Sequence, residues 1–106
     1  MLLNQEIINV LEAVKKAVVT EIIYLFGSHA YGTQNGDSDF DLFLVIPDDG
    51  IRPIDAMKQA RSAMALIERK IPVDIIADYK HRFDKRKQYN TLERKIANDG
   101  LVLYER

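Results

Sequence analysis

The sequence lacks several features that would each have pointed to a class of protein. It contains no cysteine, which excludes disulfide bonds and cysteine-ligated metal or iron–sulfur sites. No apolar run approaches the roughly 18 residues that a membrane-spanning helix needs, and the N-terminal segment has no basic region of the signal-peptide type. The net charge of −1 lacks the basic excess by which proteins hold nucleic-acid phosphates. These absences predict a cytoplasmic protein that binds neither membranes nor nucleic acid.

At 106 residues, the chain is expected to form a single domain over residues 1–106 with one modest core. Its apolar content of 47% and charged content of 29% are typical of a globular protein. The charge is unevenly distributed: residues 1–50 carry two basic and eight acidic groups, and residues 51–106 carry thirteen basic and eight acidic groups. This gradient fits a metal site beside an anionic substrate, and it fits a protein without such a site equally well.

Hydrophobic spacing divides the chain into alternating helices and strands. Apolar residues at three- and four-residue intervals predict helices over residues 4–18, 53–70 and 81–98, the first capped by Asn4. Short apolar runs bounded by glycine or proline predict strands over residues 21–27, 40–47, 71–79 and 100–106. The order indicates an α/β fold with helices covering a mostly buried sheet, but the pattern does not determine the strand order.

Two aspartates stand at the start of the second predicted strand. Because side chains alternate along a strand, Asp39 and Asp41 project from the same face. Carboxylates this close resist ionising together unless a cation lies between them. In a chain without cysteine, the cation that suits them is a hard ion such as Mg²⁺, which often shares its oxygen ligands with substrate phosphates. Alternatively, the segment "DSDFD" is only an acidic turn that precedes a strand.

Two further features favour the metal site over the acidic turn. Asp74 lies within the apolar run "PVDIIA", where a charge is costly unless it is paired or bound to metal. If the third strand neighbours the second, Asp74 joins Asp39 and Asp41. Gly27 and Ser28 end the first strand before a predicted helical turn, where backbone N–H groups and the serine hydroxyl suit a polyphosphate. A tight turn would use the same two residues.

Together, "GS", ten residues, "DFD" and a later strand aspartate resemble the signature of the polymerase β-like nucleotidyltransferase superfamily. The length of the chain is similar to that of its minimal nucleotidyltransferase (MNT) family. The resemblance covers nearly the whole chain and implies a small mixed β-sheet flanked by helices, the palm-like fold of polymerase β. It also implies a partner with a helical HEPN domain, as in toxin–antitoxin pairs.

The resemblance implies transfer of AMP from Mg²⁺-ATP to a hydroxyl group, with release of pyrophosphate. Gly27 and Ser28 would bind the nucleotide, and Asp39 and Asp41 would bridge two Mg²⁺ ions. Asp74 would complete the second ion's site and accept the hydroxyl proton. Because the chain ends soon after its core, we expect the hydroxyl to belong to a partner protein, a HEPN-type toxin that the domain silences as antitoxin.

Several alternatives stay open at this stage. Many relatives carry arginine in the segment that here reads "GSHAYG", so any phosphate-binding charge must come from elsewhere. His29 in that segment is either a nucleotide contact or an ordinary exposed histidine. The basic residues of 80–89 either bind an anion or form a solvated helix face. The domain could also neutralise a partner by contact alone, or act on a small molecule or an RNA end.

Overall fold

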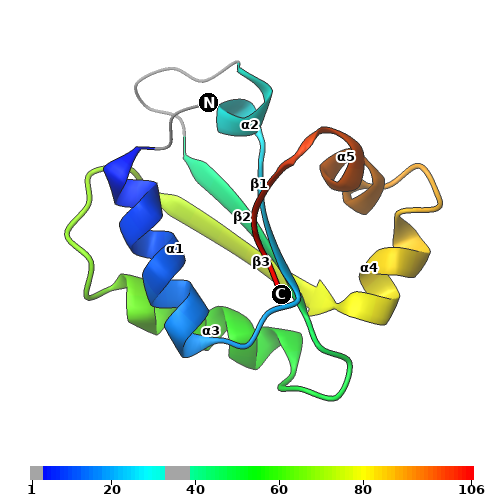
Figure 1. Ribbon diagram of the computed structural model, residues 1–106, viewed down its shortest axis with the longest axis horizontal. Coiled ribbons are helices and arrows are strands. Elements are labelled where there is room, and N and C mark those ends of the chain that lie inside the picture. The colour runs from blue at the N-terminus through cyan, green and yellow to red at the C-terminus, as the bar shows by residue number, and fades with distance from the viewer. Residues whose placement is uncertain (1–3, 33–38) are drawn as a thin grey trace.

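A mixed four-stranded sheet in the order β3-β2-β1-β4 forms the centre of the computed structural model (Figure 1). The structure describes residues 4–32 and 39–106. The strands are β1 (Ile22–Phe26), β2 (Phe40–Ile46), β3 (Val73–Tyr79) and β4 (Leu101–Glu105). β2 pairs with β3 in parallel, and β1 pairs antiparallel with both β2 and β4. The mixed sheet flanked by helices agrees with the fold expected from the resemblance.

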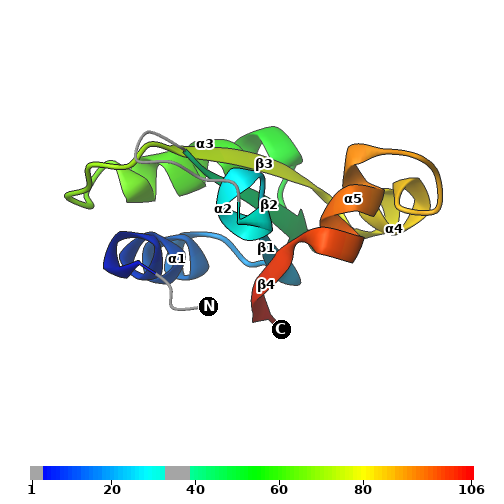
Figure 2. The same cartoon turned by 90° about the horizontal axis from the view of Figure 1, so that it is seen from above.

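Within the described ranges, five helices flank this sheet: α1 (Gln5–Ala17), α2 (Ser28–Tyr31), α3 (Pro53–Met64), α4 (Lys80–Arg86) and α5 (Leu92–Asp99). Side chains of α1 and α3 pack on one face of the sheet, and those of α4 and α5 pack on the other. Figures 1 and 2 show these two helix pairs on opposite sides, with the short α2 beside the end of β1. None of the helices in the described ranges combines the length and apolar character that a bilayer crossing requires.

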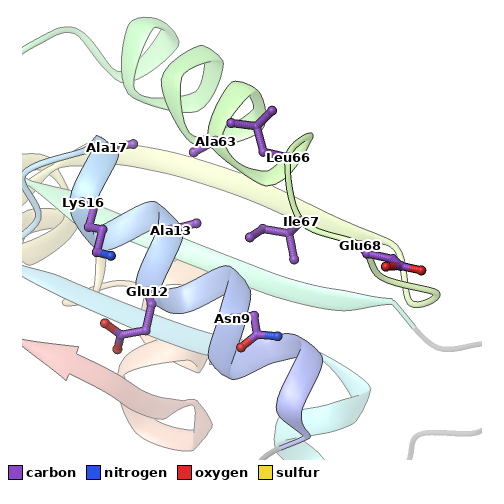
Figure 3. Close-up of a pocket in the computed structure, with 9 residues that line it drawn as sticks. All are labelled: Asn9, Glu12, Ala13, Lys16, Ala17, Ala63, Leu66, Ile67 and Glu68. Carbon is purple, nitrogen blue, oxygen red and sulfur yellow. The ribbon is translucent and has the colours of Figure 1, made fainter.

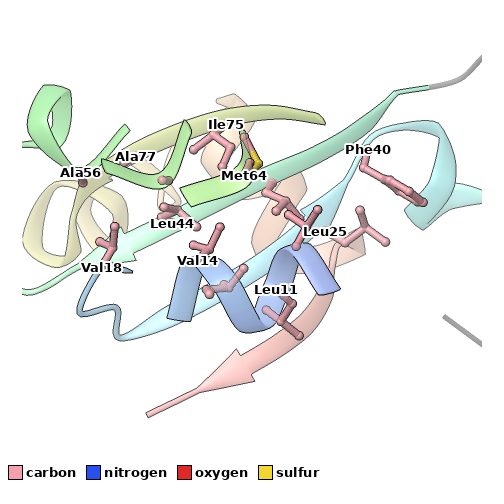
Figure 4. Packing of buried hydrophobic residues seen from close by; sticks show 14 of the residues in the cluster. Leu11, Val14, Val18, Leu25, Phe40, Leu44, Ala56, Met64, Ile75 and Ala77 are labelled. Atoms are coloured by element: carbon pink, nitrogen blue, oxygen red, sulfur yellow. The ribbon is translucent and has the colours of Figure 1, made fainter. Parts of the chain in front are cut away.

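Strand alternation divides the buried side chains between two clusters. Phe40, Leu42 and Leu44 face α1 and α3, where they join the main core around Val14 and Met64 (Figure 4). Phe43 and Val45 point the other way, toward α4 and α5. Because β2 is central, both of its faces are covered over most of its length. The period of two therefore assigns Asp41, which precedes Leu42, to the same face as Phe43.

The first helix is held at its N-terminus by hydrogen bonds that also fix a distant loop. Asn4 accepts a bond of 2.6 Å from the Glu6 N–H, which confirms the predicted cap. The Glu6 carboxylate accepts bonds from the N–H groups of Lys70 at 2.7 Å and Ile71 at 3.0 Å. These two bonds lower the pKa of Glu6 and anchor the segment that leads into β3.

The helix predicted over residues 53–70 ends six residues early, at Met64. Its buried face consists of Ala56, Ala60 and Met64, whereas Ile54 is 44% exposed. After α3 the chain turns back toward β3, and Leu66 is 88% exposed. Helical spacing continued through Ile67, but the hydrogen bonds that Lys70 and Ile71 donate to Glu6, and the Pro72 that follows, impose a different backbone.

The helix predicted over residues 81–98 is two helices, α4 and α5, separated by residues 87–91. The Thr91 hydroxyl donates a 2.7 Å bond to the Arg86 carbonyl and accepts a 3.2 Å bond from the Arg94 N–H. It therefore ends one helix and caps the next. Arg86 and the buried Glu93 form an ion pair at 2.7 Å that joins the two helices.

Phe83 fastens α4 to the sheet, so its removal should destabilise the domain. Its ring is 1% exposed and lies 5.5 Å from the ring of Tyr24 and 5.2 Å from that of Phe43. We expect Phe83→Ala to lower the free energy of unfolding by about 3–5 kcal/mol in urea denaturation. Leu66→Ala, at an exposed position, should change it by less than about 0.5 kcal/mol. Equal losses in the two variants would contradict this packing.

Candidate functional site

The predicted acidic residues meet where β2 and β3 begin. In the parallel register Asp41 lies opposite Asp74, on adjacent strands about 4.8 Å apart. Register partners in a parallel pair project from the same face, so both carboxylates point to the side away from α1 and α3. The Phe40 N–H donates a 3.0 Å bond to the Pro72 carbonyl, which ties the two strand starts together. β3 therefore neighbours β2, as the predicted cluster requires.

Asp39 lies immediately before β2. The pKa of Asp41 is affected by the carboxylates of both Asp39 and Asp74. Burial raises the pKa of Asp41 first, followed by the negative charges of Asp74 and Asp39. His29 acts in the opposite direction. Asp39 and Asp74 are thus each near enough to Asp41 to repel its carboxylate, and a bound divalent cation would relieve this repulsion.

The apolar neighbours of Asp74 in the sequence suggested that its charge is buried, and this is wrong. The predicted position of Asp74, on a strand next to that of Asp41, is confirmed. The side chains of β3 alternate between buried and exposed, and Asp74 is exposed along with Ile76 at 39%. No burial penalty therefore demands a metal at Asp74. The exposure instead means that the described residues leave this part of the sheet face open to a ligand, whereas α4 covers β3 nearer its C-terminal end.

Gly27 brings the backbone directly against the carboxylate of Asp41. Its φ of 76° and ψ of −160° lie in a region that is essentially restricted to glycine. A Cβ at this position would collide with the Asp41 Oδ2 and lie 3.2 Å from its Cγ. The end of β1 can therefore approach β2 only because residue 27 has no side chain.

Ser28 follows as the first residue of α2, so the expected helical turn after Gly27 is present. The helix is one turn long: the Ala30 N–H donates to the Gly27 carbonyl at 3.1 Å, and Gly32 ends it in the left-handed conformation. A helix this short has few aligned peptide dipoles, so any attraction for phosphate must come from local N–H groups and the Ser28 hydroxyl.

The donor atoms suit a hard divalent cation, but their side chains are not gathered into a complete site. Asp39, Asp41 and Asp74 offer only carboxylate oxygens, the ligands that Mg²⁺ prefers. Within residues 4–32 and 39–106, however, no group of three or more acidic or histidine side chains is arranged to hold a metal ion. The register brings Asp41 and Asp74 together, while a three-carboxylate site would require the side chains to reorient.

The remaining candidate residues are mostly structural. The aromatic residues Tyr24, Phe40 and Phe43 are buried in the core. His29 differs from the expected exposed histidine, since it is half-buried and its ring lies 4.2 Å from that of Phe40. Within the basic stretch, cations bind nearby carboxylates in the ion pairs Lys80–Asp84, Lys87–Asp84, Arg82–Asp78 and Arg86–Glu93. This local neutralisation favours the solvated helix face over an anion site.

A groove of about 750 Å³ lies elsewhere, between α1 and the end of α3 (Figure 3). Ala13, Ala17 and Ile67 line it, with Glu12 and Lys16 at its edge. Both helices cover the sheet face opposite the carboxylates. The groove is therefore separated from the candidate site by the sheet.

The fold and the acidic strand starts define a nucleotidyltransferase-type domain, and comparison with known families agrees. The chain belongs to the polymerase β nucleotidyltransferase family, whose model matches residues 5–106. The match confirms at family level the resemblance that the Gly-Ser and Asp-x-Asp pattern indicated. No curated protein matches the sequence.

Three solved structures share the fold. A proposed nucleotidyltransferase from Sulfolobus solfataricus has a TM-score of 0.65 at 21% identity, covering 96% of this chain and 79% of its own. A toxin–antitoxin structure with AMP-PNP has a TM-score of 0.57 at 24% identity, covering 98% and 75%. A doubly substituted MntA–HpeT toxin–antitoxin structure has a TM-score of 0.56 at 17% identity, with the same coverage.

Two glycines with the same φ provide a test of the contact between Gly27 and Asp41. Gly32 also has a φ of 76°, but a Cβ there would meet nothing within 4 Å. We expect Gly32→Ala to cost about 1 kcal/mol of unfolding free energy, from backbone strain alone. Gly27→Ala should cost about 3 kcal/mol or more, because its backbone region is more restricted and Asp41 must move. Urea denaturation of both variants measures the difference, and equal costs would contradict the close approach.

The raised pKa of Asp41 predicts an unusual pH dependence. The folded state binds the Asp41 proton more tightly than the unfolded state, so ionisation destabilises the fold as the pH rises through the folded pKa. Asp41→Asn should therefore raise the free energy of unfolding at pH 7, and the gain should shrink as the pH falls toward about 4. Urea denaturation at both pH values measures it.

Asp55 provides a control, because its substitution should change the stability at pH 7 in the opposite direction. A hydrogen bond from Arg52 lowers the pKa of Asp55, so Asp55→Asn should lose stability at pH 7, with the loss fading toward acidic pH. If Asp41→Asn destabilised the protein at pH 7, or stabilised it equally at both pH values, the pKa of Asp41 would not be raised by burial and by its acidic neighbours as inferred.

Proposed function

We propose that this protein transfers AMP from Mg²⁺-ATP to a hydroxyl group on a partner protein, and that this partner is a HEPN-domain toxin. The observation that carries the proposal is the parallel register of Asp41 and Asp74 on an open face, next to the Gly27–Ser28 turn. Family membership supports nucleotidyl transfer as the reaction class. An ATP-dependent reaction also suits a cytoplasmic location.

Two of the proteins that share the fold support the proposal that ATP is the donor and that the partner is a toxin. One is a toxin–antitoxin structure with AMP-PNP, an ATP analogue. The other is an MntA–HpeT variant in which two aspartates two positions apart are changed to glutamate, the same spacing as that of Asp39 and Asp41 here. By analogy, we assign the nucleotide to the Gly27–Ser28 turn and the Asp-x-Asp pair to metal binding.

In the proposed reaction the acceptor oxygen attacks the α-phosphorus in line with the bond to the departing pyrophosphate. The exposed Asp74 accepts the hydroxyl proton, and the Ser28 hydroxyl donates a hydrogen bond to a phosphate oxygen. Asp39, Asp41 and Asp74 would hold two Mg²⁺ ions, which supply charge neutralisation and lower the pKa of the hydroxyl when bound. Gly27 keeps the backbone close enough for one ligand to span the turn and the carboxylates.

The proposal is tested by incubating the protein with Mg²⁺-ATP and the protein that co-purifies with it, and then measuring intact masses. We expect the partner to gain the mass of one AMP. Asp74→Asn should slow this modification by about 100-fold or more, because the proton acceptor is lost. Asp78→Asn is the matched control, since Asp78 lies on the same strand but pairs with Arg82 at 3.1 Å.

Other outcomes point to other functions. A stable complex without a mass change would favour neutralisation by contact, a reading consistent with carboxylates that are not gathered into a closed metal site. Pyrophosphate release that required a small alcohol or an RNA end would contradict a protein acceptor. Modification that persisted in Asp41→Asn and Asp74→Asn would place the chemistry elsewhere.

A further inference from the structure

The strongest unexplained contact near the candidate site joins α2 to β2. The ring centroids of His29 and Phe40 are 4.2 Å apart, with an angle of 40° between the ring planes. His29 is the residue after Ser28, and Phe40 stands between Asp39 and Asp41. The contact therefore links the two short segments that the proposed reaction assigns to nucleotide and metal.

Phe40 is a rigid anchor for this contact. Its side chain is 3% exposed and belongs to the main core, together with residues of α1 and α3 (Figure 4). Its N–H is also bonded to Pro72 at the start of β3. A ring held by both the core and the neighbouring strand has little freedom, so a residue packed against it becomes fixed in position.

The Gly27–Ser28 turn needs such an anchor more than the strands do. Gly27 contributes no side chain, and α2 is a single turn bounded by glycines at both ends. Glycine permits many backbone conformations, so the position of this turn must be set by contacts of the residues between the glycines. Ala30 packs against the main core, and His29 contacts Phe40 directly.

We propose that His29 is a positioning residue, whose ring on Phe40 locks the Gly27–Ser28 turn in a fixed relation to Asp39 and Asp41. The contact between the His29 and Phe40 rings performs this role. The effect on ligand binding rests on the proposed function. If the turn moves away from the carboxylates, a nucleotide–metal complex should bind more weakly.

The test compares four proteins: the unaltered chain, His29→Ala, His29→Phe and His81→Ala. His29→Phe keeps an aromatic ring against Phe40 but removes the nitrogens. His81→Ala is the matched control, since the His81 ring stacks on Tyr79 at 5.6 Å on the α4 side of the molecule. Binding of AMP-PNP in the presence of Mg²⁺ is measured by calorimetry, and amide hydrogen exchange is measured at Ser28–Ala30 and Phe40–Asp41.

We expect His29→Ala to weaken binding by about three- to tenfold, the effect of losing one aromatic pair. Exchange at both segments should become faster in that variant. His29→Phe should restore binding to within about twofold and exchange to that of the unaltered chain. His81→Ala should leave both quantities unchanged.

Failure of this inference is distinguishable from failure of the proposed function. If His29→Ala leaves exchange at both segments unchanged, the positioning role is wrong, whatever the binding results. If His29→Phe does not restore exchange, the ring contact does not hold the turn and the positioning role is again overturned. If the unaltered chain does not bind AMP-PNP while exchange responds as expected, the positioning role stands and the proposed function falls.

Discussion

The parallel pairing of β2 with β3 is the interaction on which the candidate site depends. It places Asp41 opposite Asp74, and the hydrogen bond from the Phe40 N–H to the Pro72 carbonyl fixes where the pairing begins. A shift of one residue would turn Asp74 to the face that α1 and α3 cover, where a charge would be buried in the main core. The alternation of buried and exposed side chains along β3 therefore sets the register, and the register brings Asp41 and Asp74 together.

Elements distant in sequence support this pairing from outside the site. Glu6, on the first turn of α1, holds the backbone of residues 70 and 71 just before β3. On the opposite face, Phe83 packs against Tyr24 and Phe43, so α4 and α5 leave the strand starts uncovered. Among the described residues the site is open, because the helices that could cover it lie toward the other end of the sheet.

Local patterns predicted most of the elements and all the candidate acids. Residue spacing located α1 with its Asn4 cap, and the apolar runs located the four strands. The predicted helix ends were wrong where long-range contacts override local preference. Helical spacing continued past Met64, but Glu6 binds the loop that follows. The sequence also suggested a buried Asp74, because an apolar run does not reveal which face of an edge strand is left open.

By itself, the sequence determined the chemical groups and their local spacing: a glycine that can adopt a positive φ, an adjacent serine, and two aspartates on one face of a strand. These follow from backbone stereochemistry and the period of a strand, which act over a few residues. Only the tertiary structure decided that Asp74 lies opposite Asp41, that Gly27 contacts the Asp41 carboxylate, and that His29 packs on Phe40. Strand order and register arise from packing the whole core, and no local pattern contains that information.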